Sequence, residues 1–96
     1  MLGPEVWIVV PAYNEAGVVA GVAGELVALG ASVVVVDDGS DDGTAEALRG
    51  VPAAVCRHAV NLGQGAALAT GIEYARRRGA SVVVTFDADG QHRAED

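Results

Sequence analysis

The stretch SVVVVDDGSDDGT, Ser32 to Thr44, places four consecutive valines directly before an acidic segment that contains two glycines. An uninterrupted run of β-branched residues is typical of a strand buried on both faces, as in a parallel sheet. The aspartates and glycines that follow favour a turn. The same order, an apolar run and then a polar segment, recurs along the chain, so this stretch indicates the fold of the whole.

Three further runs have the composition and length of strands: Glu5–Val10, Ala53–His58 and Ser81–Phe86. Patterns typical of helices lie between the strands, at Ala16–Leu29, Thr44–Arg49 and Gly65–Arg78. Apolar residues at helical spacing are expected to form the buried stripes of the two longer helices. These residues are Val18, Val22, Leu26 and Leu29 in the first, and Leu68, Ile72 and Ala75 in the other.

Strict alternation of strands and helices predicts an α/β fold, a Rossmann-like doubly wound half-domain. The expected sheet is four-stranded and mainly parallel, in the order 3-2-1-4, with helices on both faces. The arginine triplet Arg76–Arg78 falls in the last turn of the third helix, where cations suit the helix dipole. A solvated turn is the simpler interpretation of the triplet, and a contact with phosphate or a membrane surface is the alternative.

Composition narrows the classes of function. The 96 residues correspond to one small domain, or a piece of a larger one, with 51% hydrophobic residues. The net charge is −7 and all six basic residues are arginine, which argues against nucleic acid as a partner. Cys56 is the only cysteine, and the first residues do not resemble a signal peptide, so a cytoplasmic chain is expected.

Distinctive polar segments follow all four predicted strands. They are PAYNEAG (11–17), DDGSDDGT (37–44), HAVNLGQG (58–65) and DADGQH (87–92). Ligands of open parallel sheets bind beyond the carboxyl ends of the strands, where the winding reverses. The four segments are therefore expected to converge on one edge of the sheet and to form a binding site there.

The last of these segments suggests a divalent metal. Asp87 and Asp89 offer hard oxygen ligands, which suit Mg²⁺ or Mn²⁺ rather than zinc, and Gln91 or His92 is near enough to add another. Such ions take their remaining ligands from water and substrate phosphates. A D-x-D pair alone is often only a solvated turn, but its place after a buried strand favours a site.

The other segments each allow two interpretations. Tyr13 could stack on a base with Glu15 hydrogen bonding nearby, or Asn14 could simply cap a helix. Asp38 could accept a base N–H or a ribose hydroxyl, whereas Asp37 could orient the loop. Turn and cap roles are expected of Asp41 and Asp42, and a loop role of His58.

Four motifs in order, IVVPAYNEA, VVVVDDGSDDGT, NLGQGAALATGIEYA and VVVTFDADGQH, resemble the nucleotide-binding half of family-2 inverting glycosyltransferases of the GT-A fold. The similarity is greatest to the dolichol-phosphate mannosyltransferase, or polyprenyl-phosphate sugar transferase, branch. It implies that Pro11, Tyr13 and Glu15 cradle the nucleoside and that Val36 and Asp38 contact base and ribose. It also implies that the D-x-D region meets the cation and the sugar diphosphate through Asp87, Ala88, Asp89 and Gln91.

The same resemblance implies a donor such as a GDP- or UDP-sugar and a lipid-phosphate acceptor, at the cytoplasmic face of a membrane in the complete enzyme. Residues 1–96 would be the nucleotide-sugar-binding half, without the acceptor half or the general base, and inactive alone. Gln64 departs from the pattern, because many members carry lysine there.

Two other functions remain open from the residues. Haloacid-dehalogenase-like phosphatases also place D-x-D-G after a strand, and Asp87 would then be the nucleophile. A non-catalytic nucleotide-binding or assembly module is the second, with self-association through the Ser81–Phe86 strand if its edge is bare. An NAD-binding domain is disfavoured, because no G-x-G-x-x-G follows the first strand.

Overall fold

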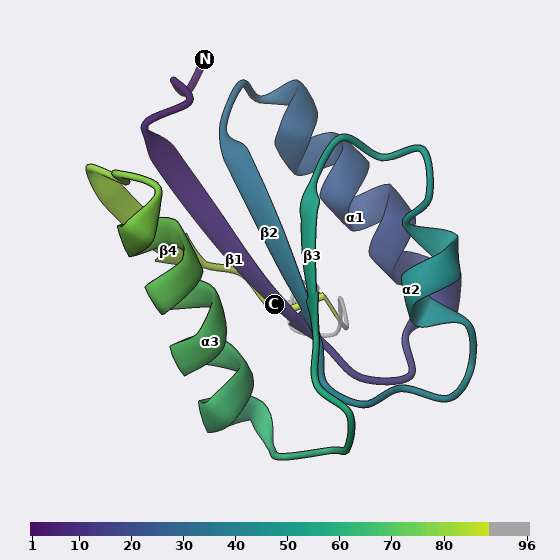
Figure 1. Ribbon diagram of the computed structural model, residues 1–96. Helices are drawn as coiled ribbons and strands as arrows, with labels where there is room; N and C mark the ends of the chain where they lie inside the picture. The colour runs from purple at the N-terminus through teal and green to yellow at the C-terminus, as the bar shows by residue number, and fades with distance from the viewer. Residues whose placement is uncertain (89–96) are drawn as a thin grey trace, which may run out of the picture.

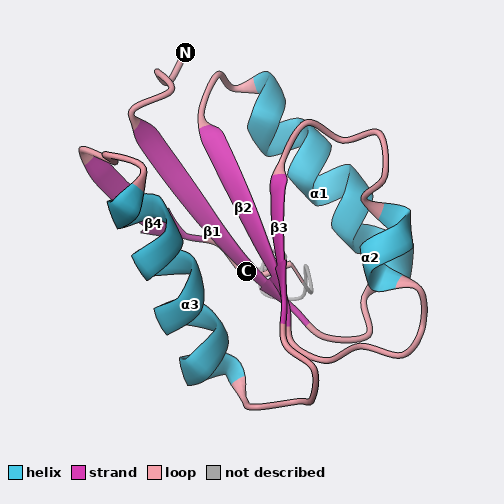
Figure 2. Cartoon of the chain, in the orientation of Figure 1, coloured by secondary structure: helices cyan, strands magenta, loops and turns pink. Residues whose placement is uncertain are grey.

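The computed structural model describes residues 1–88. The predicted site residues Asp89 and Gln91 lie outside the described residues. Strands and helices alternate strictly from β1 to β4 (Figures 1 and 2). The elements are β1 (Val6–Ala12), α1 (Ala16–Ala28), β2 (Ser32–Asp37), α2 (Thr44–Ala47), β3 (Ala54–Arg57), α3 (Gln64–Arg77) and β4 (Val82–Thr85).

The four strands form one parallel sheet in the order β3-β2-β1-β4, which confirms the predicted topology. Helices α1 and α2 cover one face and α3 covers the other (Figure 1). Ala12 at the end of β1 pairs with Asp37 at the end of β2. The segments that follow these strands therefore leave the sheet at the same edge.

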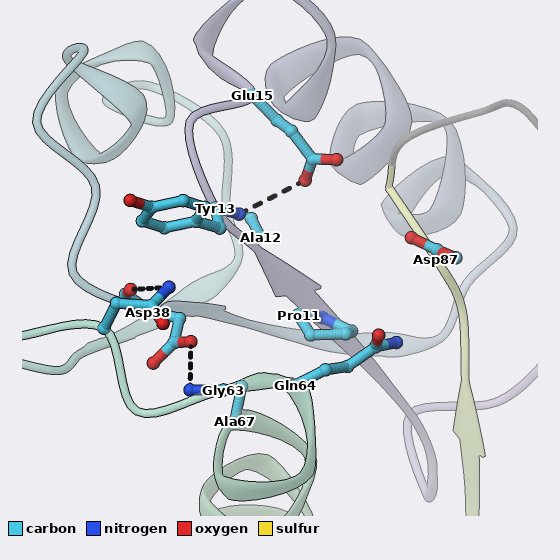
Figure 3. A pocket seen from close by; sticks show the side chains of 10 residues that line it. Pro11, Ala12, Tyr13, Glu15, Asp38, Gly63, Gln64, Ala67 and Asp87 are labelled. Atoms are coloured by element: carbon cyan, nitrogen blue, oxygen red, sulfur yellow. Dashed lines mark hydrogen bonds between the residues drawn. The ribbon is translucent and has the colours of Figure 1, made fainter.

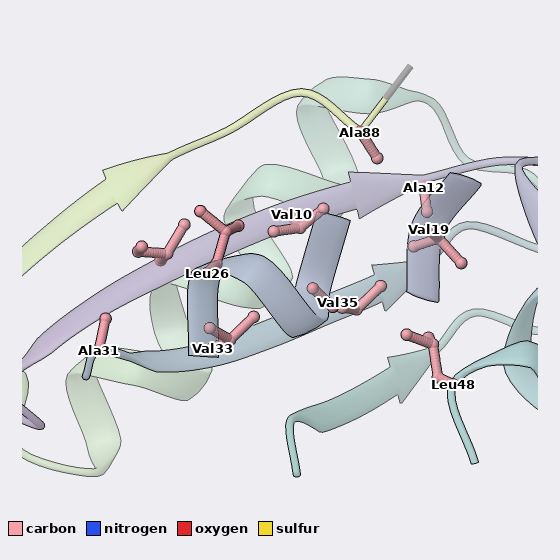
Figure 4. Packing of buried hydrophobic residues seen from close by; sticks show 11 residues of the cluster. Val10, Ala12, Val19, Leu26, Ala31, Val33, Val35, Leu48 and Ala88 are labelled. Atoms are coloured by element: carbon pink, nitrogen blue, oxygen red, sulfur yellow. The ribbon is translucent and has the colours of Figure 1, made fainter. Parts of the chain in front are cut away.

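The two central strands are buried on both faces, as the valine runs predict. Alternate residues of β1 and β2 point to the α1 side, where Val10 and Val35 pack with Val19 and Leu26 of α1 (Figure 4). The residues between them, such as Val9, face α3. Because helices cover both faces of the sheet, the central strands need no row of polar residues facing solvent.

The buried stripes of the two long helices agree with the prediction only in part, at Leu26 in α1 and at Ala75 in α3. Helix α1 buries Val19, Ala23 and Leu26, whereas the predicted Val18 and Leu29 are 44% and 48% exposed. Helix α3 buries three small residues, Ala67, Gly71 and Ala75, and the predicted Ile72 is 41% exposed. Small side chains bring a helix axis closer to the sheet, so the stripe of α3 follows close packing rather than residue size.

The edge strands β3 and β4 are less buried than expected for Ala53–His58 and Ser81–Phe86. In β4, Val82 and Val84 are exposed, and Phe86 just beyond the strand is exposed as well. Self-association through this edge stays a prediction. Within residues 1–88, no helix combines the length and the apolar character needed to cross a bilayer.

Replacing Gly71 with alanine is expected to destabilise the fold by about 1–3 kcal/mol through overpacking. An added Cβ would lie 2.3 Å from Cγ1 of Val9 and 3.1 Å from Cγ2 of Val36. The control is Gly21→Ala in α1, where nothing lies within 4 Å of the added carbon. That variant should gain about 0.5–1 kcal/mol from helix propensity. Urea unfolding measures the stability of both variants. Equal stability would contradict the close approach of α3 to the sheet at Gly71.

Candidate nucleotide-binding site

A cavity of about 440 Å³ opens at the carboxyl edge of the sheet (Figure 3). Its volume lies within the range of small-molecule sites, roughly 300–1,000 Å³. All four predicted segments contribute to the lining. The lining residues are Pro11, Ala12, Tyr13, Glu15, Asp38, Asn61, Gly63, Gln64, Ala67 and Asp87.

The end of β1 supplies one wall of this cavity. Pro11 and Ala12 are buried, whereas Tyr13 is 48% exposed, so its ring is available to a ligand. The backbone N–H of Tyr13 donates to Oε1 of Glu15 at 3.3 Å. This bond holds the Glu15 carboxylate close to the main chain at the cavity wall (Figure 3).

The start of α1 is capped from another part of the chain. Asn14 does not cap the helix, contrary to the alternative drawn from the sequence; its side chain accepts from the N–H of Asp41, and its own N–H donates to Oγ of Ser40. Asp42 accepts from the N–H of Ala16, the first residue of α1, and from the N–H of Thr44. The predicted cap role of Asp42 therefore extends to both α1 and α2.

The two adjacent aspartates after β2 have different surroundings. Asp37 is fully buried, with Oδ1 accepting from the N–H of Ser40 and Oδ2 lying 3.7 Å from Nε of Arg57. Oδ2 of Asp37 has no hydrogen-bond partner in the described part of the chain. Asp37 does not line the cavity, so the loop-orienting role expected of it fits its position.

Asp38 lines the cavity and also holds the segment that leads into α3. Its Oδ1 accepts from Nδ1 of His58 at 2.8 Å and from the N–H of Leu62 at 3.0 Å, and its Oδ2 accepts from the N–H of Gly63 at 2.8 Å. Burial raises the pKa of this carboxyl, but the bonds from His58, Leu62 and Gly63 together outweigh burial and leave the pKa below its ordinary value.

The end of the glycine-rich segment and the first turn of α3 form the opposite wall. Gly63, Gln64 and Ala67 line the cavity, and none of the three was predicted to contact a ligand. Asp38 was the only ligand contact predicted from the segments 37–44 and 58–65. The signal in the sequence was the NLGQG motif itself, because glycines before a helix allow close approach of main chain to ligand.

The arginine triplet lies at the far end of α3 from the cavity. Arg76 and Arg77 hydrogen bond to Glu73, and these bonds lower the pKa of Glu73 to about 2. The guanidinium of Arg78 stacks on the ring of Tyr74 at 3.7 Å. A helix of 14 residues is roughly 20 Å long, so the triplet is too distant to contact a ligand in the cavity.

Of the described residues after β4, Asp87 brings its carboxylate to the cavity. The predicted contacts Ala88 and Val36 are both fully buried, and neither is among the described residues that line the cavity. Within residues 1–88, no group of three or more His, Cys, Asp or Glu side chains could hold a metal ion. The predicted partners of Asp87, which are Asp89 and Gln91, lie outside these residues.

The described lining carries three carboxylates, those of Glu15, Asp38 and Asp87, and no arginine. Such a cavity repels a bare phosphate group. A divalent cation held by Asp87 fits this donor set, since hard cations bind one or two carboxylates and take further oxygens from phosphates.

Replacing Asp38 with asparagine is expected to lower stability by about 2–3 kcal/mol at pH 7, because bonds to a charged acceptor are lost. The folded-state pKa of Asp38 lies below its ordinary value of 3.8, so the unfolded chain takes up the proton first as the pH falls. The stabilisation of the fold by the ionised Asp38 carboxylate is complete above about pH 5. It is lost as the pH falls through 3.8 and then through the folded-state pKa.

Urea unfolding between pH 7 and pH 2 measures this difference. The control is Asp41→Asn, whose side chain is exposed; its pH dependence should follow that of the wild type. A difference between Asp38→Asn and wild type that stays constant down to pH 2 would contradict the assigned bonds.

Comparison with known proteins identifies the family. Residues 7–96 match the family described as glycosyl transferase family 2. The chain belongs to this family. The resemblance seen in the sequence is thereby confirmed, and family membership argues against the phosphatase alternative, because the match includes Asp87.

Three relatives of this family 2 chain cover nearly all of it. An uncharacterised protein of Methanocaldococcus jannaschii, MJ1222, is 44% identical over 93 residues, 96% of this chain and 38% of that protein. The UDP-N-acetylglucosamine–dolichyl-phosphate N-acetylglucosaminyltransferase of Methanococcus voltae is 31% identical (95% of this chain, 43% of that protein). The polyprenol monophosphomannose synthase of Mycolicibacterium smegmatis is 34% identical (93% of this chain, 37% of that protein). The chain thus spans less than half the length of each relative.

A solved structure shares the fold. The mannosyltransferase PcManGT from Pyrobaculum calidifontis, in complex with GDP-Man and Mn²⁺, superposes with a TM-score of 0.70 at 29% identity. The match covers 93% of this chain and 28% of that one. The α/β sheet of this family 2 chain therefore matches that of a glycosyltransferase, as the sequence predicted.

Proposed function

We propose that residues 1–96 form the nucleotide-sugar-binding part of a glycosyltransferase that requires Mg²⁺ or Mn²⁺ and transfers a sugar to a polyprenyl phosphate. The observation that carries the proposal is the cavity at the carboxyl edge of the sheet, where Tyr13, Asp38 and Asp87 from three separate segments meet. Relatives named for transfer to dolichyl phosphate and for polyprenol monophosphomannose synthesis support the acceptor class.

Each wall of the cavity has a distinct role in the proposal. Tyr13 offers a ring face for a base, and Asp38 offers an acceptor for one hydroxyl or N–H of the nucleoside. Asp87, with Asp89 and Gln91 as the predicted partners, would hold the cation. When bound, the cation supplies positive charge that offsets the charge developing on the leaving diphosphate.

The neutral side chain of Gln64 supports a need for the cation. Gln64 begins α3 and lines the same cavity as Asp87 and Pro11 (Figure 3). An amide there can hydrogen bond to a phosphate oxygen but adds no positive charge. With no arginine in the described lining, attraction between the protein and a diphosphate depends on the bound ion.

The 96-residue chain is therefore expected to bind a nucleotide sugar only when Mn²⁺ or Mg²⁺ is present. Isothermal titration calorimetry with UDP-N-acetylglucosamine and with GDP-mannose, each with Mn²⁺ and with EDTA, measures this directly. Heat of binding with Mn²⁺ and none with EDTA is the expected result. Binding that is unchanged by EDTA, or no binding of either donor by a chain that circular dichroism shows to be folded, would contradict the proposal and favour a non-catalytic module.

A further inference from the structure

His58 occupies the junction between β3 and the cavity wall. Its side chain is 12% exposed, with Nδ1 2.8 Å from Oδ1 of Asp38 and Nε2 2.8 Å from Oγ1 of Thr70 on α3. An ionised carboxylate only accepts hydrogen bonds, so Nδ1 carries the hydrogen of the first contact. The loop role expected from the sequence does not account for a ring held at both nitrogens.

The contacts of Asp38 show what His58 does to its carboxylate. Oδ1 receives two donors, Nδ1 of His58 and the N–H of Leu62, which fill the two acceptor positions of that oxygen. Oδ2 receives the N–H of Gly63, which leaves one further acceptor position on it within the described part of the chain. The imidazole thus fixes the rotation of the carboxylate together with the N–H groups of Leu62 and Gly63.

The same carboxylate fixes the main chain that lines the cavity. Asn61 Nδ2 donates to the backbone oxygen of Asp38 at 3.3 Å, and Asn61 and Gly63 both line the cavity. A carboxylate that rotated would release the N–H groups of Leu62 and Gly63 together. The His58–Asp38 bond thus holds the carboxylate to which this wall is attached through the N–H groups of Leu62 and Gly63.

We propose that His58 is a positioning residue for nucleotide binding. It holds the Asp38 carboxylate so that Oδ2 presents a single acceptor to one hydroxyl or N–H of the nucleoside, and so that the segment 61–63 stays in place. The inference rests on the proposed function for its ligand, but the contacts that carry it lie within the protein.

Two substitutions separate this role from simple packing between β3 and α3. The amide nitrogen of asparagine overlays Nδ1 of a histidine, so His58→Asn keeps a donor to Asp38 and loses the contact with Thr70. The amide nitrogen of glutamine overlays Nε2, so His58→Gln keeps the contact with Thr70 and loses the donor to Asp38. Both variants remain polar and neutral, which makes them matched controls for one another.

Calorimetric titration with UDP and with GDP in the presence of Mn²⁺ compares wild type and both variants of the 96-residue chain. His58→Gln should bind about 10-fold more weakly or worse, because a bond to a charged acceptor is lost, and His58→Asn should stay within about threefold of wild type. Equal affinities of the two variants, or an unchanged affinity of His58→Gln, would overturn the proposal.

Amide hydrogen exchange provides a readout that needs no ligand. The N–H groups of Leu62 and Gly63 should exchange faster in His58→Gln than in wild type or His58→Asn, and the wild-type imidazole should show a hydrogen on Nδ1 by nitrogen NMR. If wild type binds neither UDP nor GDP, the proposed function fails, whereas faster exchange in His58→Gln still supports the positioning role. Exchange that is the same in all three proteins, or a wild-type Nδ1 without hydrogen, overturns that role.

Discussion

Asp87→Asn is expected to weaken Mn²⁺-dependent binding of a nucleoside diphosphate by about 100-fold or more. Loss of a residue that merely supports a metal ligand lowers metal affinity by about 10- to 100-fold, and Asp87 is proposed to be a ligand itself. Asparagine keeps the size of the side chain and removes its charge. The change therefore tests the carboxylate that the segment after β4 brings to the cavity.

The matched control is Asp41→Asn, which alters the net charge of the chain by the same one unit. Asp41 is exposed and does not line the cavity. Titration of UDP and GDP with Mn²⁺ should give wild-type affinity for Asp41→Asn and little or no binding for Asp87→Asn. Similar affinities of the two variants would show that Asp87 does not hold the cation, and thermal unfolding verifies that both remain folded.

The strands and their order could be predicted from the sequence because their signals are local. A run such as Val33–Val36 is β-branched and apolar at every position, which is typical of a strand buried on both faces. Alternation with helices then leaves few topologies, since parallel crossovers are right-handed. Ligands of such sheets bind beyond the carboxyl ends of the strands, where the winding reverses. The convergence of the four polar segments on one edge follows from the same rule.

The faces of the helices could not be predicted in the same way. In α3 the predicted stripe and a stripe of small residues share Ala75, and both fit helical spacing. Hydrophobicity favours the predicted stripe, because it contains Leu68 and Ile72. The sheet selects the small stripe, Ala67, Gly71 and Ala75, because Val9 and Val36 already fill the space beneath Gly71. Which stripe wins depends on the partner surface, which the helix sequence alone does not contain.

The contacts that organise the cavity were also hidden, because their partners are distant in the sequence. Asn14 and Ser40 are 26 residues apart, and Asp38 and His58 are 20 apart. A histidine after a strand has no periodic pattern that distinguishes a loop residue from one bonded at both nitrogens. Topology predicted where the segments gather, but not which side chains join them.

Gly39→Ala is expected to destabilise the fold by about 2–5 kcal/mol, combining a left-handed backbone penalty of about 1–2 kcal/mol with overpacking of about 1–3 kcal/mol. Gly39 has φ of +79°. An added Cβ would lie 2.4 Å from the carbonyl carbon of Val60 and 2.5 Å from the nitrogen of Asn61. Both are main-chain atoms, so a change of rotamer cannot relieve the clash.

The substitution should also disrupt the cavity, because Asn61 can move away from Gly39 only by pulling the segment 61–63 from Asp38. We therefore expect loss of nucleotide binding even at temperatures where the chain stays folded, together with faster amide exchange at Leu62 and Gly63. Those two amides donate to the Asp38 carboxylate in the wild type.

The control variant Gly43→Ala separates the left-handed backbone penalty from the overpacking. Gly43 has φ of +85°, close to that of Gly39, but nothing lies within 4 Å of a Cβ built on it. Urea unfolding should show a loss of only about 1–2 kcal/mol for this control, with nucleotide affinity retained. If Gly39→Ala were no less stable than Gly43→Ala and still bound UDP or GDP, the segments after β2 and β3 would not be in main-chain contact, and the wall that they form together would not be a fixed part of the site.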